Sequence, residues 1–185
     1  MFRSNFYIFT GGPGAGKTTL LEALAARGYA TVEEAARAVL KQQAATGGNA
    51  THDGDRARYR DLMLERSIAA FRAVRETVAP VFFDRGIPEL SGYGNPPGAA
   101  DPPALSRAIS ECRYNETVFL FPPWQAIYVH DAERKHSFAH AIAVYEEMLA
   151  TYPKFGYRTT EVPCASVEDR VRFVLDTVSR TPPRR

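Results

Sequence analysis

The feature that most constrains the fold of this chain is a glycine-rich run close to its start. Residues 11–18 read Gly-Gly-Pro-Gly-Ala-Gly-Lys-Thr, which satisfies the pattern Gly-x-x-x-x-Gly-Lys-Ser/Thr. An apolar run at 6–10 precedes it and a Leu- and Ala-rich stretch follows it, as a strand and a helix around such a loop require. The glycines let backbone N–H groups close around phosphate oxygens, and the helix directs its positive end at the anion. We therefore expect a phosphate-binding loop.

This loop predicts that the chain binds ATP or GTP together with Mg²⁺. Lys17 supplies a mobile positive charge near the β- and γ-phosphates, and the Thr18 hydroxyl is a suitable Mg²⁺ ligand. The chain has no Asn-Lys-x-Asp motif for reading guanine, so the base stays open. The expected nucleotide-binding residues are consecutive: Gly12, Pro13, Gly14, Ala15, Gly16, Lys17, Thr18 and Thr19.

Short apolar runs alternate with helical patterns along the rest of the chain, which predicts an α/β fold with a mainly parallel sheet covered on both faces. A Gly- and Pro-rich surface loop is expected at 91–103. The five expected strands are 6–10, 29–32, 81–84, 118–121 and 157–162. The expected helices are 17–27, 34–45, a long one from Asp53 or Asp55 to about Val78, 104–112, 137–151 and 167–179.

Length and composition favour one domain and exclude some partner classes. We place a single domain at 1–180, with a lid segment near 122–140 and a loose tail at 181–185. The net charge of +2 gives no electrostatic case for nucleic acid. No apolar stretch approaches the ~20 residues of a membrane helix, and no secretion signal is recognised. Two cysteines without motif spacing favour a reducing cytoplasm.

Charged residues follow two of the expected strands at their carboxyl ends, where ligands collect in open α/β sheets. Asp84 ends one strand and precedes Arg85, so it can hold Mg²⁺ through water or accept a hydroxyl proton, whereas Arg85 suits a phosphate or carboxylate. The alternative for Asp84 is the N-cap of a helix that starts at Ile87. Glu34 is preferred over Glu33 as a second site carboxylate.

Arg37 lies one helical turn beyond Glu34 and could join the same site, while the alternative for these residues is a solvated helix start. The lid segment contributes Arg134, which could close over the γ-phosphate, or belong to an ordinary solvated charge run.

Weaker candidates in the second half of the chain have structural alternatives that we favour. These are Lys135, Arg113, the His136/His140 pair as metal ligands, and Trp124 with Tyr128 as stacking aromatics.

Several further motifs accompany the phosphate loop. They are Glu-Glu-Ala-Ala-Arg at 33–37, Phe-Phe-Asp-Arg-Gly at 82–86, Tyr-Asn-Glu-Thr-Val-Phe-Leu-Phe-Pro-Pro-Trp at 114–124, Asp-Ala-Glu-Arg at 131–134 and Gly-Tyr-Arg-Thr-Thr-Glu-Val-Pro at 156–163. With them, the chain resembles small bacterial AAA-family ATPase domains of the P-loop kinase type. These are similar to the ribosylnicotinamide kinase domain of the bifunctional NAD-biosynthesis regulator, and more distantly to thymidylate and deoxynucleoside kinases.

The resemblance implies a three-layer P-loop NTPase fold of the nucleoside- and nucleotide-kinase kind, with a lid over the phosphates. It also implies that Glu34 and Arg37 face the acceptor, that Asp84 and Arg85 act as the acidic-Arg pair of such kinases, and that Arg134 is a lid arginine. Residues 163–166 would then lie by the nucleotide base. The lid offers few arginines, however, and no AAA sensor arginine or hexamer finger is present.

Together these features predict an ATP- and Mg²⁺-dependent small-molecule kinase that transfers a phosphoryl group to a hydroxyl or phosphate acceptor. Lys17, Arg85, Asp84, Glu34 and Arg134 are the expected catalytic residues. Glu34, Arg37 and Arg85 are expected to contact the acceptor, and Thr18 and Asp84 to hold the metal. The alternatives are a nucleotide-dependent switch with slow hydrolysis and, more weakly, a nucleic-acid-processing ATPase.

Overall fold

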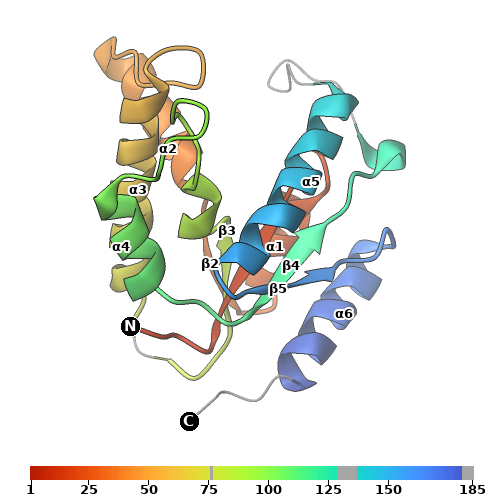
Figure 1. Cartoon of the computed structure of the whole chain (residues 1–185). Helices are drawn as coiled ribbons and strands as arrows, with labels where there is room; N and C mark the ends of the chain where they lie inside the picture. Colours follow the sequence, from red (N-terminus) through yellow and green to blue (C-terminus); the bar gives the residue numbers. More distant parts are fainter. Residues whose placement is uncertain (76, 129–136, 181–185) are drawn as a thin grey trace.

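The computed structural model describes residues 1–75, 77–128 and 137–180, and within them it forms five strands, six α-helices and two short 3₁₀ helices (Figure 1). The strands are β1 (Phe6–Gly11), β2 (Ala30–Val32), β3 (Val81–Asp84), β4 (Thr117–Phe121) and β5 (Arg158–Glu161). The α-helices are α1 (Lys17–Ala25), α2 (Ala35–Thr46), α3 (Arg56–Ala73), α4 (Pro103–Glu111), α5 (Phe138–Lys154) and α6 (Val167–Arg180). The 3₁₀ helices are η1 (Ile87–Leu90) and η2 (Gln125–Ile127).

The five strands form one sheet in the order β2-β3-β1-β4-β5, and every pairing is parallel. β1 lies at its centre, with Phe9 level with Asp84 of β3 on one side and with Phe119 of β4 on the other. The carboxyl ends of β1 and β3 therefore lie next to each other. The predicted α/β architecture with a five-stranded sheet is confirmed, and the sheet is wholly rather than mainly parallel.

Alternate residues of each buried strand face opposite layers of helices. The even-numbered positions of β1, such as Phe6 and Ile8, pack with residues of α2, α3, α4 and α5. The odd-numbered positions, Tyr7 and Phe9, pack with Leu20 and neighbours on α1 and α6. Figure 1 shows α5 crossing one side of the sheet while α1 lies behind it. This two-faced burial explains why the central strands are continuous apolar runs.

The long helix α3 ends earlier than the sequence pattern predicts. It begins after Asp55, whose side chain accepts a hydrogen bond from the Arg58 backbone N–H at 2.9 Å, so Asp55 rather than Asp53 is the cap. It ends at Ala73, and Val78 is fully exposed, so the expected end of this helix near Val78 is wrong.

The physical reason lies in the connection from α3 to β3. The Asn5 side chain donates to the carbonyls of Thr77 and Ala79 at 2.8 and 2.9 Å, and Pro80 disfavours helical geometry in the residue before it.

The other element boundaries agree with the expected ones to within a few residues. α2 ends with Gly47 in the left-handed region at φ +67°, a conformation that glycine commonly adopts at the end of a helix. α5 continues three residues past the expected end and carries Pro153 in its last turn. The expected surface loop has turns at 91–94 and 97–98 and no helix or strand before α4 begins at Pro103. Among the described residues, no helix is both long and apolar enough to cross a membrane.

Candidate active site

The glycine-rich loop connects the end of β1 to the start of α1 and is packed tightly against two other elements. Gly11 has φ +124°, and a Cβ there would collide with the backbone of Phe121 in β4. A Cβ on Gly12 would collide with the backbone carbonyl of Ala141 in α5. Glycine is thus required at both positions because backbone comes too close for any side chain. The loop is fixed between β4 and α5 before it reaches α1.

Lys17 is the first residue of α1, and its side chain turns back into the loop. Its ammonium donates to the carbonyls of Gly11 and Gly12 at 2.9 and 2.8 Å, and the residue is only 8% exposed. Burial lowers the pKa of Lys17 to about 8, aided by the charge of Arg85 and opposed by Asp84 and Glu34. The lysine is a desolvated cation whose only hydrogen-bond partners in the described residues are two carbonyls.

Asp84 lies at the carboxyl end of β3, 8% exposed. Its Oδ1 is buried and has no hydrogen-bond partner among the described residues. Burial raises the pKa of Asp84, although the nearby Lys17 lowers it in part. η1 is capped by Gly86 instead, so the N-cap alternative for Asp84 is not what the structure shows. A buried carboxylate oxygen without a partner suits a hydroxyl proton or the hydration shell of a cation.

Arg85 has a left-handed backbone, φ +71°, the one such non-glycine residue in the described chain. This strained conformation turns its guanidinium toward three acceptors. Nε donates to Glu34 Oε1 at 2.7 Å, Nη1 donates to Glu89 Oε2 at 2.6 Å, and Nη2 donates to the Gly11 carbonyl at 3.4 Å. Arg85 therefore joins the phosphate loop, the start of α2 and η1 in one network.

Glu34 occupies the N-cap position of α2. Of the two glutamates considered from the sequence, Glu34 is partly buried and Glu33 is exposed. Burial alone would raise the pKa of Glu34, but the charges of Arg85 and Lys17 hold it below its usual value. Arg37 lies 3.9 Å from Glu34 Oε2 and donates to the Thr18 hydroxyl at 3.4 Å. Its side chain is 70% exposed, so it lies at the rim of this cluster.

A cavity of about 320 Å³ opens beside these charged groups, between α2, α3 and the end of β3. One end of the cavity is polar, and its walls farther in are mainly apolar. The polar end is lined by Glu33, Glu34, Asp84, Arg85 and Glu89. The remaining lining includes Val32, Ala35, Ala36, Met63, Ala70, Phe83, Leu90 and Tyr114, with Arg66 and Ser67 on α3. The Arg66 guanidinium donates to the Gln42 side chain at 2.7 Å.

Two residues of this network were missed by sequence reasoning. Glu89 holds Arg85 and also accepts a hydrogen bond from the Tyr152 hydroxyl of α5 at 2.7 Å. The four-residue spacing of Arg85 and Glu89 was a usable signal for an ion pair, although Arg85 itself precedes η1 and is not helical. Tyr152, far along the chain on an unrelated helix, carried no such signal.

The remaining predicted residues fall in three places. Arg134, Lys135 and His136 lie outside the described residues, as does the middle of the predicted lid segment. Arg113 is not near the cluster: it precedes β4 at the opposite edge of the sheet and stacks on Tyr157 at 4.2 Å. Tyr128 packs against the loop itself, because a Cβ on Gly14 would lie 2.6 Å from its ring.

A glycine-rich loop between a parallel strand and a helix, with a buried lysine inside it and a carboxylate on the neighbouring strand, defines the class of P-loop nucleotide-binding proteins. The AAA domain family matches residues 6–170, and the chain belongs to this family. No curated protein matches the chain in sequence.

Among solved structures, the chain is similar to thymidylate kinase from Ehrlichia chaffeensis. The TM-score is 0.60 at 13% identity, over 95% of this chain and 98% of that one. At this identity the likeness concerns the fold, and it confirms the predicted three-layer P-loop NTPase architecture of the nucleotide-kinase kind. The finer resemblance to ribosylnicotinamide kinase stays a prediction.

Proposed function

We propose that this protein is an ATP- and Mg²⁺-dependent kinase of a small molecule that carries a hydroxyl group. The observation that carries the proposal is the shared charged cluster: Glu34, Asp84 and Arg85 line one end of the acceptor-sized cavity, and Arg85 also contacts the loop carbonyl that Lys17 binds. A nucleotide on the loop and a molecule in the cavity would thus meet across the same side chains. A plain nucleotide switch has no need of such a second cavity.

The residues present fit a Mg²⁺-nucleotide. The Thr18 hydroxyl would supply a hard oxygen ligand directly, and the Asp84 carboxylate would hold the Mg²⁺ through water, which leaves its buried, unpartnered Oδ1 for the acceptor hydroxyl. The bound metal supplies neutralisation of phosphate charge. Residues 12–19 hold the phosphates, and Lys17 leaves its two carbonyl partners to stabilise negative charge on the transferred group.

The hydrogen bonds that Arg85 already makes indicate which chemical group of the acceptor receives the phosphoryl group. The Arg85 guanidinium already pairs with two carboxylates and donates to one carbonyl, so its positive charge is compensated before an acceptor phosphate could bind. The polar end of the cavity carries four carboxylates, those of Glu33, Glu34, Asp84 and Glu89, beside Arg85, and an anionic acceptor would be repelled there. An uncharged hydroxyl meets no such penalty. We therefore assign Arg85 to positioning Glu34 and Glu89.

Asp84 is the better proton acceptor of the two predicted carboxylates. Glu34 is paired with Arg85, and its pKa is lowered, whereas the pKa of Asp84 is raised and its Oδ1 is unpartnered. In the proposed reaction, the acceptor oxygen forms a bond to the γ-phosphorus as the bond to the β-phosphate oxygen breaks. ADP leaves, and the hydroxyl proton passes to Asp84. Arg37 contacts the acceptor from the rim, and Arg134 is proposed as a lid residue.

Matched acceptor pairs test the proposal. Nucleosides, other metabolite alcohols and their monophosphates are each incubated with ATP and Mg²⁺, and both ADP release and phosphorylated products are measured. The expected result is product from at least one alcohol and none from its monophosphate. Product from monophosphates alone would overturn the hydroxyl assignment, and slow hydrolysis that no acceptor accelerates would favour the switch alternative.

A further inference from the structure

Arg170, in the first turns of α6, reaches the phosphate loop from the side opposite the cavity. It is 3% exposed, and its Nη2 donates to the backbone carbonyl of Ala15 at 2.9 Å. A Cβ on Gly16 would lie 2.6 Å from its Nη1. The guanidinium is therefore packed directly on the backbone of the loop's last turn. Sequence reasoning assigned it no role.

The surroundings of Arg170 supply no opposite charge within the described residues. Its guanidinium carbon lies 5.0 Å from the ring centre of Phe121 and 5.6 Å from that of Trp124. Its Nε is buried without a hydrogen-bond partner among the described side chains and backbone. No ion pair to Arg170 is found in this part of the chain, and desolvation lowers its pKa. The neighbouring Asp169 instead pairs with Arg172, 3.3 Å away.

A buried cation of this kind costs free energy in the nucleotide-free protein, because it has lost its hydration without gaining an anion. Cation–π contacts and one carbonyl offset only part of this cost. A triphosphate bound on the other side of the loop supplies negative charge that Lys17 does not fully neutralise. In a poorly hydrated site, that charge interacts strongly with a nearby arginine.

We propose that Arg170 is a nucleotide-positioning residue, a buried cation that fixes the Ala15 peptide and whose charge the bound triphosphate compensates. The inference rests on the proposed nucleotide binding at residues 12–19. It extends that site to α6, and it makes α6 part of the nucleotide-binding machinery instead of a covering helix only. Arg170 acts through the loop, so its contribution falls on nucleotide affinity.

Three substitutions separate the charge from the hydrogen bond. Arg170→Met removes both. Arg170→Gln keeps an N–H donor without the charge, and Arg170→Lys keeps the charge without the planar guanidinium group. We expect Arg170→Met to weaken ATP binding about tenfold, as loss of one nearby charge in a poorly solvated site implies. The melting temperature of the nucleotide-free variant should equal or exceed that of the wild type, because a desolvated charge is gone. Arg170→Lys should restore most of the ATP affinity, and Arg170→Gln should restore little.

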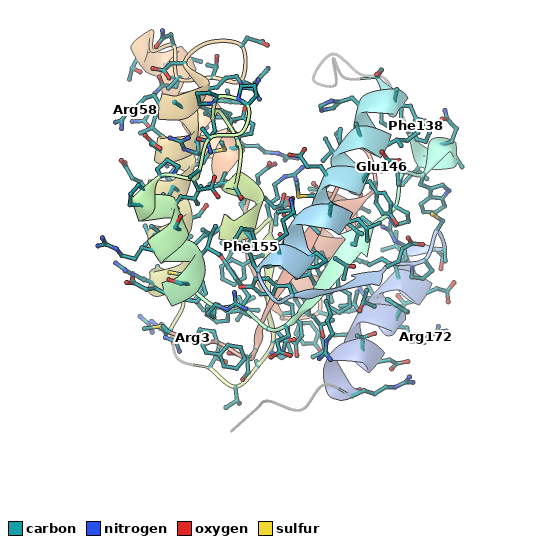
Figure 2. The ribbon with its side chains drawn as sticks, viewed as in Figure 1. Arg3, Arg58, Phe138, Glu146, Phe155 and Arg172 are labelled. Atoms are coloured by element: carbon teal, nitrogen blue, oxygen red, sulfur yellow. The ribbon has the colours of Figure 1, made fainter. Side chains whose placement is uncertain are left out.

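The experiment is isothermal titration calorimetry with ATP and with ADP in the presence of Mg²⁺, beside thermal unfolding without nucleotide. The matched control is Arg172→Met on the same helix. The Arg172 side chain is 65% exposed and lies at the outer side of α6 (Figure 2). This control should leave both affinities unchanged. A charge effect predicts a larger loss for ATP than for ADP, which a merely structural role would not produce.

The results that would overturn the inference are specific. ATP affinity of Arg170→Met within twofold of the wild type would do so, as would equal losses for ATP and ADP. If Arg170→Met does not fold, Arg170→Gln decides by the same two criteria. A wild-type protein that binds no nucleotide would instead overturn the proposed function, so the two failures are distinguishable.

Discussion

Three buried charged residues, Lys17, Asp84 and Arg170, have incomplete compensation in the nucleotide-free protein. Lys17 donates only to carbonyls, Asp84 has an unpartnered oxygen, and Arg170 faces aromatic rings. Arg85, by contrast, is held by two carboxylates. At the scale of the residue, Lys17, Asp84 and Arg170 can still bind a charged or polar partner. Arg85 has its partners already and has a structural role. Substitutions should therefore separate binding and turnover from stability.

Asp84→Asn should slow phosphoryl transfer about 100-fold, as loss of a positioned proton acceptor does. The thermal stability of the nucleotide-free protein should stay equal or rise, because a desolvated carboxylate is replaced by a neutral group of the same shape. Acceptor-dependent ADP release and calorimetric unfolding measure the two effects. Asp176→Asn, on the exposed face of α6, is the matched control and should change neither. An unchanged rate in Asp84→Asn would remove this aspartate from the reaction.

The lowered pKa of Lys17 predicts a pH dependence of stability. Between about pH 8 and its ordinary value of 10.5, the unfolded chain holds the lysine proton and the folded chain has released it. The free energy of unfolding of the nucleotide-free protein should therefore rise with pH in this window, by about 1 kcal/mol per unit. Urea unfolding at a series of pH values below 10, before the tyrosines ionise, measures it.

Lys17→Met is the control for this pH series, and its profile should be flat. Equal slopes in the two proteins would contradict the buried, desolvated state of the lysine. The same substitution, like Lys17→Ala, should abolish nucleotide-dependent turnover while the fold is retained. Full activity in Lys17→Ala would refute the phosphate-loop mechanism.

The site residues that belong to a local motif or follow a strand could be predicted from the sequence, whereas those that act through tertiary contacts could not. Lys17 and Thr18 belong to a local motif, and Asp84 and Glu34 could be placed because each follows a strand at one sheet edge. Glu89 was missed although it lies four residues from Arg85, and its second partner, Tyr152, is 63 positions away. Arg170 contacts Ala15, which is 155 positions away. A carboxylate partner was one of the two options expected for Arg85, but its simultaneous pairing with Glu34 and Glu89 depends on a left-handed backbone conformation that the sequence does not reveal.

At the scale of elements, the loop depends on its neighbours β4 and α5. The collision that a Cβ on Gly12 would make with Ala141 involves backbone, which cannot move aside as a flexible side chain can. The sequence predicted the strands well because buried parallel strands are continuous apolar runs. It placed the end of α3 wrongly because the apolar spacing continues to Val78 while Asn5 and Pro80 direct the chain away from the helix.

Gly12→Ala should displace α5 from the loop. We expect a loss of about 2 kcal/mol in the free energy of unfolding, typical of overpacking, together with weaker ATP binding. Denaturant unfolding and calorimetric titration give the two values. Gly47→Asn is the control, because that position is open, lies at φ +67°, and asparagine tolerates this conformation. Wild-type stability in Gly12→Ala would contradict the close packing of α5 on the loop.

At the scale of the whole molecule, the sheet brings the ends of β1 and β3 together, so that the loop and the cavity share one charged cluster. The helices α2 and α3 form the cavity on one side, while α6 supports the loop from the other. The chain belongs to the AAA domain family and has the fold of a nucleotide kinase. The proposal that a phosphoryl group passes from the loop to the cavity is based on this shared cluster.

The most direct test of the central claim follows a labelled γ-phosphate. The protein is incubated with γ-¹⁸O-labelled ATP, Mg²⁺ and a mixed pool of metabolites, and the products are analysed by mass spectrometry with Asp84→Asn in parallel. The account predicts a labelled phosphate ester on a hydroxyl-bearing metabolite, strongly reduced with the variant. Label found only in inorganic phosphate, equally with both proteins, would contradict it.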